Sequence, residues 1–139
     1  MFTQIKTSRE NREIVAQLTR RLNLGAENII ARMAYSYSLS KDRRLNLNDL
    51  ADSGGKEYSR SVLFGDHDDV YIGLLCTHYT IYKTDKDLGK YVKLHIDDGL
   101  NLIDLELKKA NNIDGFDFLV ELISSNLSTS SDLFIEKLT

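Results

Sequence analysis

The sequence has no proline, a single cysteine and no long apolar run. At the usual frequency of ~5%, a chain of this length would contain about seven prolines. Their absence excludes proline-rich linkers and PxxP ligands, and it leaves the predicted helices without proline kinks. The lone Cys76 excludes an internal disulfide and a zinc site built from cysteines, which fits a reducing compartment.

Long hydrophobic segments are also absent. The longest apolar run, residues 70–76, spans seven residues, whereas a membrane helix needs about 20. The first residues, Met1 to Lys6, are too polar for a signal peptide. From these absences we expect a soluble cytoplasmic protein with no membrane partner.

The chain otherwise has the composition of one globular domain, but its charge is unevenly divided. It has 139 residues, 42% hydrophobic and 28% charged, which excludes wholesale disorder and a fibrous repeat. Residues 1–44 carry nine Lys or Arg against four acids, a net charge of +5. Residues 45–139 carry nine against 17, a net charge of −8. This asymmetry indicates a face that binds a polyanion, although an ordinary solvated surface has the same composition.

Hydrophobic periodicity predicts mostly helices. The expected order is strand, helix, helix, loop, strand and three helices, over residues 2–7, 8–22, 27–39, 40–57, 58–64, 67–83, 87–110 and 117–127. Thr7 and Glu10 have the spacing of a capping box, and Gly25 is the expected stop of the first helix. We therefore predict a mainly α (small α+β) fold: a compact helical domain with an N-terminal strand–helix–turn–helix and one further short strand.

Two of the expected helices, 67–83 and 87–110, are apolar around most of their circumference. Two such helices exceed what the core of so small a chain hides, which favours a homo-oligomer. We expect one helical domain over residues 1–127 and a flexible C-terminal tail over 128–139. Within the tail, residues 132–138 are predicted to form a short docking helix.

No catalytic or cofactor motif is present. The chain has no GxSxG, Walker or GxGxxG sequence. His67 lies among Asp66, Asp68 and Asp69, but acids that begin a helix explain this cluster better than a metal site. Cys76 and His78 diverge on a helix, which argues against a nucleophile pair. We predict no metal, no cofactor and no enzymatic activity.

The arginines near the N-terminus are the strongest functional candidates. Arg9, Arg12 and Arg20 share one face of the first predicted helix, opposite its apolar stripe. Glu13 can pair with Arg9, but exposed pairs contribute only ~0.3–0.5 kcal/mol. Arginine suits phosphate, so we predict contacts to a nucleic-acid backbone with little base reading. The predicted DNA-binding residues are Lys6, Arg9, Arg12, Arg20, Arg21, Lys41, Arg43 and Arg44.

Three stretches resemble the DNA sulfur modification protein DndE family. They are residues 22–32 (LNLGAENIIAR), 58–66 (YSRSVLFGD) and 94–100 (LHIDDGL), and with their spacing they cover most of residues 1–110. The resemblance implies a small, mainly helical, oligomeric accessory protein of DNA phosphorothioation. It also implies binding to duplex DNA, including nicked DNA, without performing the sulfur transfer. The implied partners are a PAPS-reductase-like subunit and an SMC-like ATPase.

Two other functions remain open from the residues alone. The order strand–helix–helix over residues 1–39 is that of a ribbon–helix–helix-like transcriptional regulator, which inserts a two-stranded ribbon into the major groove. The acidic body and apolar helices also suit a protein–protein scaffold subunit that does not touch DNA.

Overall fold

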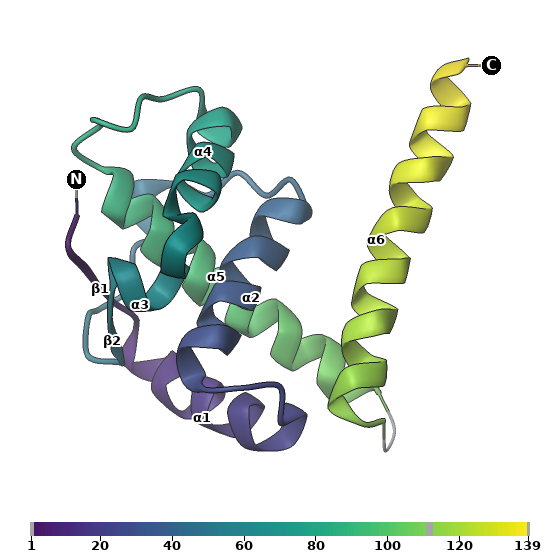
Figure 1. The fold of residues 1–139 in the computed structure, drawn as a ribbon, viewed down its shortest axis with the longest axis horizontal. Coiled ribbons are helices and arrows are strands. Elements are labelled where there is room, and N and C mark those ends of the chain that lie inside the picture. The colour runs from purple at the N-terminus through teal and green to yellow at the C-terminus, as the bar shows by residue number, and fades with distance from the viewer. Residues whose placement is uncertain (1, 111–112, 139) are drawn as a thin grey trace.

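The computed structural model describes residues 2–110 and 113–138, and the side chains of these residues as far as 127. A small antiparallel sheet and a set of helices surround one core (Figure 1). The elements are β1 (Gln4–Lys6), α1 (Arg9–Leu22), α2 (Glu27–Ser40), η1 (Leu47–Asp49), β2 (Glu57–Ser59), α3 (Arg60–Phe64), η2 (Gly65–His67), α4 (Asp68–Tyr79), α5 (Leu88–Lys109) and α6 (Gly115–Leu138). The predicted fold class is confirmed.

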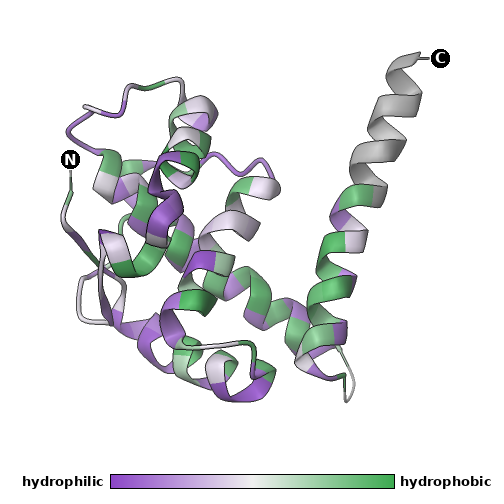
Figure 2. Ribbon diagram, viewed as in Figure 1, coloured by the Kyte–Doolittle hydropathy of each residue, from purple (hydrophilic) through white to green (hydrophobic). Residues whose placement is uncertain are grey.

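The core forms where α2 crosses α5. A Cβ atom placed on Gly99 of α5 would lie 1.8 Å from the backbone oxygen of Ala34 on α2, so glycine is what allows the two backbones to approach this closely. Apolar side chains of both helices, such as Ile30 and Leu100, are fully buried around this crossing. Figure 2 shows hydrophobic residues along much of α5.

Local signals set both ends of α1, which begins one residue later than expected and ends at Leu22 as expected. Ser8 is the N-cap, and its hydroxyl accepts a hydrogen bond from the Asn11 backbone N–H at 3.4 Å. The Thr7 hydroxyl instead donates to the backbone oxygen of Lys56 at 3.1 Å. Asn23, in the left-handed conformation, ends the helix before Gly25.

The predicted strand over residues 58–64 was wrong after Ser59. β2 pairs with β1 in an antiparallel register that sets Ile5 opposite Tyr58. The Ser59 hydroxyl then caps α3 by accepting from the Val62 N–H at 3.2 Å. Leu63 and Phe64 are both buried. Neighbouring side chains of a strand point to opposite faces, so a strand packed against the core on one face would bury only one of the two.

The last helix was expected to end at Leu127, and this was also wrong, because α6 runs from Gly115 to Leu138 without a break. The division into a domain of residues 1–127 and a tail stays a prediction. The docking role expected of residues 132–138 depends on their side chains, and these lie outside the described part of the structure. Within residues 2–110 and 113–138, no helix combines the length and apolar character needed to cross a bilayer.

Candidate nucleic-acid interface

The outer face of α1 presents three arginines to solvent. The inner face is fixed by the buried side chains of Val15, Leu18 and Leu22. At 3.6 residues per turn, this stripe turns Arg9 and Arg20 directly outward and places Arg12 on the flank. All three are exposed, as are Lys6, which precedes the helix, and Arg21 in its last turn. The structure therefore brings five of the eight predicted residues onto α1 and its approach.

These five cations are largely unpaired within the described part of the chain. Only Arg20 has an ion pair there, with Glu13 at 4.0 Å, and the two side chains are 70% and 73% exposed. The predicted partner of Glu13 was Arg9, which forms no ion pair with any described residue. An exposed pair at this distance contributes little and is screened by salt. The guanidinium groups of α1 are therefore available to an external anion.

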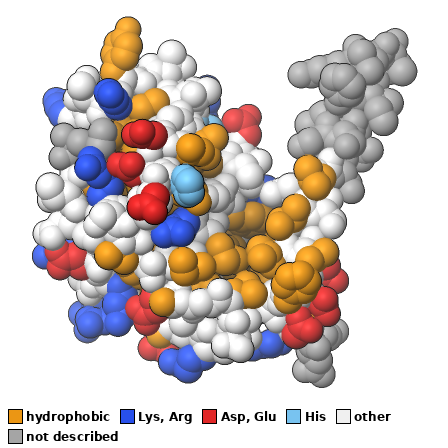
Figure 3. All heavy atoms as spheres, viewed as in Figure 1, with side chains coloured by type: hydrophobic (Ala, Val, Ile, Leu, Met, Phe, Trp, Pro, Cys, Tyr) orange, Lys and Arg blue, Asp and Glu red, His pale blue; other side chains and the backbone are white. Residues whose placement is uncertain are grey.

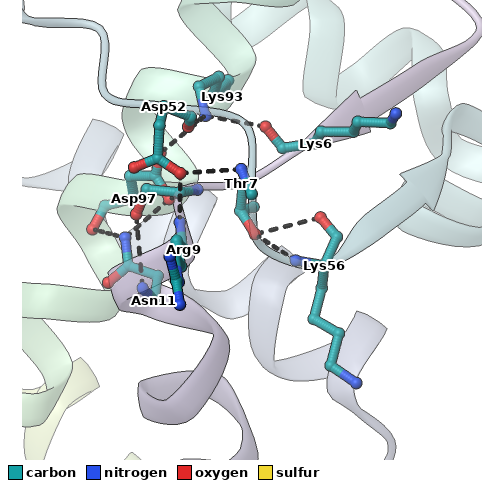
Figure 4. A network of polar contacts seen from close by, with 10 residues as sticks. Lys6, Thr7, Arg9, Asn11, Asp52, Lys56, Lys93 and Asp97 are labelled. Carbon is teal, nitrogen blue, oxygen red and sulfur yellow. Dashed lines mark hydrogen bonds and ion pairs between the residues drawn. The ribbon is translucent and has the colours of Figure 1, made fainter.

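A polar network fixes the N-terminal end of α1 to α5 (Figure 4). The Asp97 carboxylate accepts from the Ser8 backbone N–H at 3.1 Å and from the Asn11 side-chain amide at 2.7 Å. Asn11 is buried, so its amide serves this structural role and does not face solvent. Asp52 accepts from the Arg9 backbone N–H at 3.0 Å, and this bond, after the stronger one from Gly54, lowers the pKa of the Asp52 carboxyl.

The buried Lys93 completes the network. Its Nζ donates to the backbone oxygens of Lys6 at 2.8 Å and Asp52 at 2.6 Å, and it pairs with Asp97 at 3.4 Å. Lys6 and Lys56 join the network through backbone atoms, and their side chains extend away from it in Figure 4. The backbone that carries Lys6 and Arg9 is thus held in place before any ligand binds, which lowers the entropy cost of binding.

Lys41, Arg43 and Arg44 lie in a different environment, although all three are exposed. Arg43 donates from Nε to the Asp98 carboxylate at 2.8 Å. Lys41 stacks over the Tyr37 ring at 5.2 Å and shares a cleft with two glutamates, Glu106 and Glu121. These acids reduce the positive potential that a phosphate would meet.

Arg44 also has acidic neighbours. It lines a hollow together with Asp42 and Asp69. The residues predicted at the end of α2 therefore differ from the α1 group, in which one cation of five is paired within the described chain.

Arg43 is the outer end of a hydrogen-bond chain that enters the core. The Ser38 hydroxyl donates to Asp98 at 2.6 Å, so its oxygen must accept the proton of His95 Nδ1, 2.7 Å away. This places a proton on His95 Nδ1, and in a neutral ring it leaves Nε2 as an acceptor.

The other side of the His95 ring agrees with that assignment. The Tyr79 hydroxyl donates to the unprotonated Nε2 at 2.6 Å and accepts from the Leu45 backbone N–H at 3.1 Å. Burial, assisted by the nearby His78, lowers the pKa of His95 to about 4. This series of hydrogen bonds fixes the loop after α2, and with it Arg43, against the core.

Two further lysines were not among the DNA-binding residues predicted from the sequence. Lys86 and Lys90 line the same open cleft as Lys6, with a volume of about 500 Å³. Both are exposed, and Lys90 pairs with Asp87 at 3.3 Å. They were missed because residues 45–139 are acidic on average. Their spacing of four, at the start of the helix predicted for 87–110, was the signal available.

The other candidates from the sequence contribute no assembled site. No group of three or more His, Cys, Asp or Glu that suits a metal ion occurs among the described residues. Burial raises the pKa of the Cys76 thiol, which disfavours the nucleophilic thiolate. β1 pairs with β2 of its own chain, so it is not set out as the free strand that a ribbon–helix–helix protein lends to a second copy.

Comparisons with known proteins agree with this fold. Residues 4–111 match the family described as DNA sulphur modification protein DndE. The crystal structure of DndE from Escherichia coli B7A, described as involved in DNA phosphorothioation modification, superposes with a TM-score of 0.60 at 20% sequence identity. That match covers 73% of this chain and 96% of the E. coli chain, and it shows a shared fold. A comparison with curated protein sequences gave no significant match.

Proposed function

Because the chain belongs to the DndE family of DNA sulphur modification proteins, we propose that it is a non-catalytic DNA-binding subunit of the phosphorothioation machinery. In this proposal it contacts the phosphate backbone of duplex DNA, at nicks as well as in intact duplex. It acts in the cytoplasm, without a cofactor, beside a PAPS-reductase-like subunit and an SMC-like ATPase. A homo-oligomer would present several copies of one weak contact surface to the same duplex.

The observation that carries the proposal is the cationic face of α1, on which only Arg20 has an ion pair with a described residue. Arg9, Arg12 and Arg20 are exposed on one side of a helix whose first turn is held rigid by Asp97 and Lys93. Guanidinium groups bind phosphate oxygens in bidentate geometry. A net charge of −3 for the whole chain does not oppose this, because exposed charges beyond about 10 Å are screened at 0.1 M salt.

A pair of matched variants tests the proposal. Arg9→Ala/Arg12→Ala and Lys108→Ala/Lys109→Ala each remove two exposed positive charges from a helix. Lys108 and Lys109 pair with Asp104 and Glu106 of their own helix. Binding to a fluorescent duplex, intact or nicked, is titrated across salt concentrations. The α1 variant is expected to reduce the salt slope by about 2, one for each phosphate contact, and the α5 variant by less than about 0.5.

The scaffold function gives a different result in the same experiment. A wild-type protein that binds duplex without salt dependence, or equal losses in both variants, would remove the case for α1 as the DNA-binding face. Retained co-purification with the partner subunits would then favour the scaffold. Strong preference for one palindromic duplex over random duplex would instead favour the transcriptional regulator.

A further inference from the structure

The last described helix, α6, is apolar over a wider arc than the body covers. At 100° per residue, the apolar side chains of residues 116–127 span roughly 200° of its circumference, twice the stripe of an ordinary surface helix. Phe118 and Leu122 face the body and are buried. The other apolar side chains of this arc are not covered by the body to the same extent.

The uncovered part of the arc forms a regular stripe. Phe116, Val120, Ile123 and Leu127 are 67%, 45%, 51% and 63% exposed. Their spacing of four, three and four residues is that of the seam of a coiled coil. We call these four side chains the α6 stripe.

The α6 stripe continues into an apolar groove. The groove, about 310 Å³, lies between α2, α5 and α6, and its walls include Ile29, Met33, Ile103 and Leu119. Ile123 belongs to both the groove and the stripe. Figure 3 shows hydrophobic side chains gathered over the hollow between the body and α6. Stripe and groove are therefore one continuous surface.

The first half of α6 is fixed to the body. A Cβ atom on Gly115 would lie 1.8 Å from the Leu22 backbone oxygen, so the helix begins in direct contact with the end of α1. Further along, the Asn126 amide donates to the Ser40 hydroxyl at 3.0 Å. The helix begins after residue 111, where the match to the DndE family ends. The α6 stripe is thus rigidly presented, and it lies outside the segment matched by the family.

We propose that the α6 stripe is the contact surface for a second copy of this chain, with the two α6 helices antiparallel. Four large apolar side chains, each about half exposed, offer roughly 400 Å² per copy, against the ~800 Å² per partner of a standard interface. The adjoining groove, which the second α6 covers in this arrangement, supplies the remaining area. The inference rests on the proposed function only for the homo-oligomer named there.

The helix dipoles favour the antiparallel orientation, because antiparallel helices bring opposite ends of their dipoles together. In an antiparallel pair centred between Val120 and Ile123, Phe116 lies at the level of Leu127 of the second copy, so the two stripes match along their length.

The mass of the protein in solution tests the interface. Ile123→Glu places a charge in the stripe at a position that is half exposed, so the monomer is expected to fold. Leu105→Glu is the control, because Leu105 is an equally exposed apolar residue of α5 outside the groove. Light scattering is expected to show an even number of copies for the wild type and the control, and half that number for Ile123→Glu. A monomeric wild type, or an oligomer that survives Ile123→Glu, would overturn the proposal.

Cross-linking tests the orientation. In a Cys76→Ala background, Phe116→Cys and Leu127→Cys chains are mixed under mild oxidation. The two positions are eleven residues apart, about 16 Å along one helix. An antiparallel pair gives a disulfide dimer in the mixture and little in either variant alone, whereas efficient cross-linking of Phe116→Cys with itself would contradict it.

Loss of the interface and loss of the proposed function are separable. The salt dependence of duplex binding depends on α1, and the mass depends on α6. If Ile123→Glu halves the mass while the wild type shows no salt-dependent DNA binding, the interface stands and the proposed function fails. If binding is salt-dependent and the wild type is a monomer, the outcome is reversed.

Discussion

Two regions of this protein carry arginines, and they use them differently. On α1, Arg9 and Arg12 lie on the surface without an ion pair among the described residues, and only the backbone beneath them is tied to the core. After α2, Arg43 is tied to the core through its side chain, by way of Asp98, Ser38 and His95. The arginines of α1 are available to a ligand, whereas the side chain of Arg43 stabilises the fold.

The comparison shows that exposure alone does not identify a binding arginine. Arg43 as a whole residue is exposed, yet its guanidinium is held by the largely buried carboxylate of Asp98. The two regions differ in how closely an acid approaches the arginines. Asp98, 55 residues away in the chain, accepts a hydrogen bond from Arg43 at 2.8 Å. On α1, Glu13 lies 4.0 Å from Arg20, the longest distance that counts as an ion pair.

The largest effect expected from this difference is on stability. Asp98→Ala removes the acceptor of both Ser38 and Arg43, leaving the buried serine hydroxyl without its acceptor. We expect the free energy of unfolding in urea to fall by about 2–4 kcal/mol. Glu13→Ala, the matched loss of an acid on α1, serves as the control and should cost less than about 0.5 kcal/mol. Equal effects would erase the distinction between the regions.

Acid should weaken the region after α2 next. Because the pKa of His95 is about 4 in the folded protein and ~6.5 when unfolded, the unfolded chain binds the proton more readily. This stability is therefore complete above pH 6.5 and is lost as pH falls toward 4, by about 2 kcal/mol at pH 5. Urea unfolding from pH 7 to pH 4 measures the loss. In His95→Gln the same pH range should show a shallower decline; an unchanged profile would assign the effect to other groups.

The third effect is on DNA binding. Arg9→Ala/Arg12→Ala/Arg20→Ala should weaken duplex binding about tenfold or more at moderate salt and reduce the salt slope by about 3. Lys41→Ala/Arg43→Ala/Arg44→Ala removes the same charge from acidic surroundings and should reduce the slope by about 1 or less. Circular dichroism confirms that both variants are folded. A larger loss from the second triple would move the interface to the end of α2.

The smallest effect concerns the ion pair between Glu13 and Arg20. Glu13→Gln frees Arg20 and removes a negative charge from the arginine face. Stability should stay within about 0.5 kcal/mol of the wild type, and duplex affinity should rise up to about twofold at low salt. A fall in affinity would mean that Glu13 positions Arg20 for its contact.

Features decided by neighbouring residues followed from the sequence, and features decided by distant ones did not. The helical period of Val15, Leu18 and Leu22 correctly placed the arginines of α1 outside. The alternation after Tyr58 suggested a strand, because the competing signal, the cap supplied by Ser59, is equally consistent with a turn. The burial of Asn11 depends on Asp97 of α5, 86 residues away in the chain, whose carboxylate accepts a hydrogen bond from the Asn11 amide.

By itself the sequence determined α1 and its two faces, because a 3.6-residue period and its capping side chains act within a few residues of one another. It also placed a positive charge on the first third of the chain and a negative one on the remainder. Only the tertiary structure decided which positive charges stay available, since the acids and carbonyls that engage Arg43 and the buried Lys93 come from segments tens of residues away. The packing of α2, β1 and the segment around η1 against α5 brings those partners together, and hydrogen bonds and ion pairs depend on distance in space rather than in sequence.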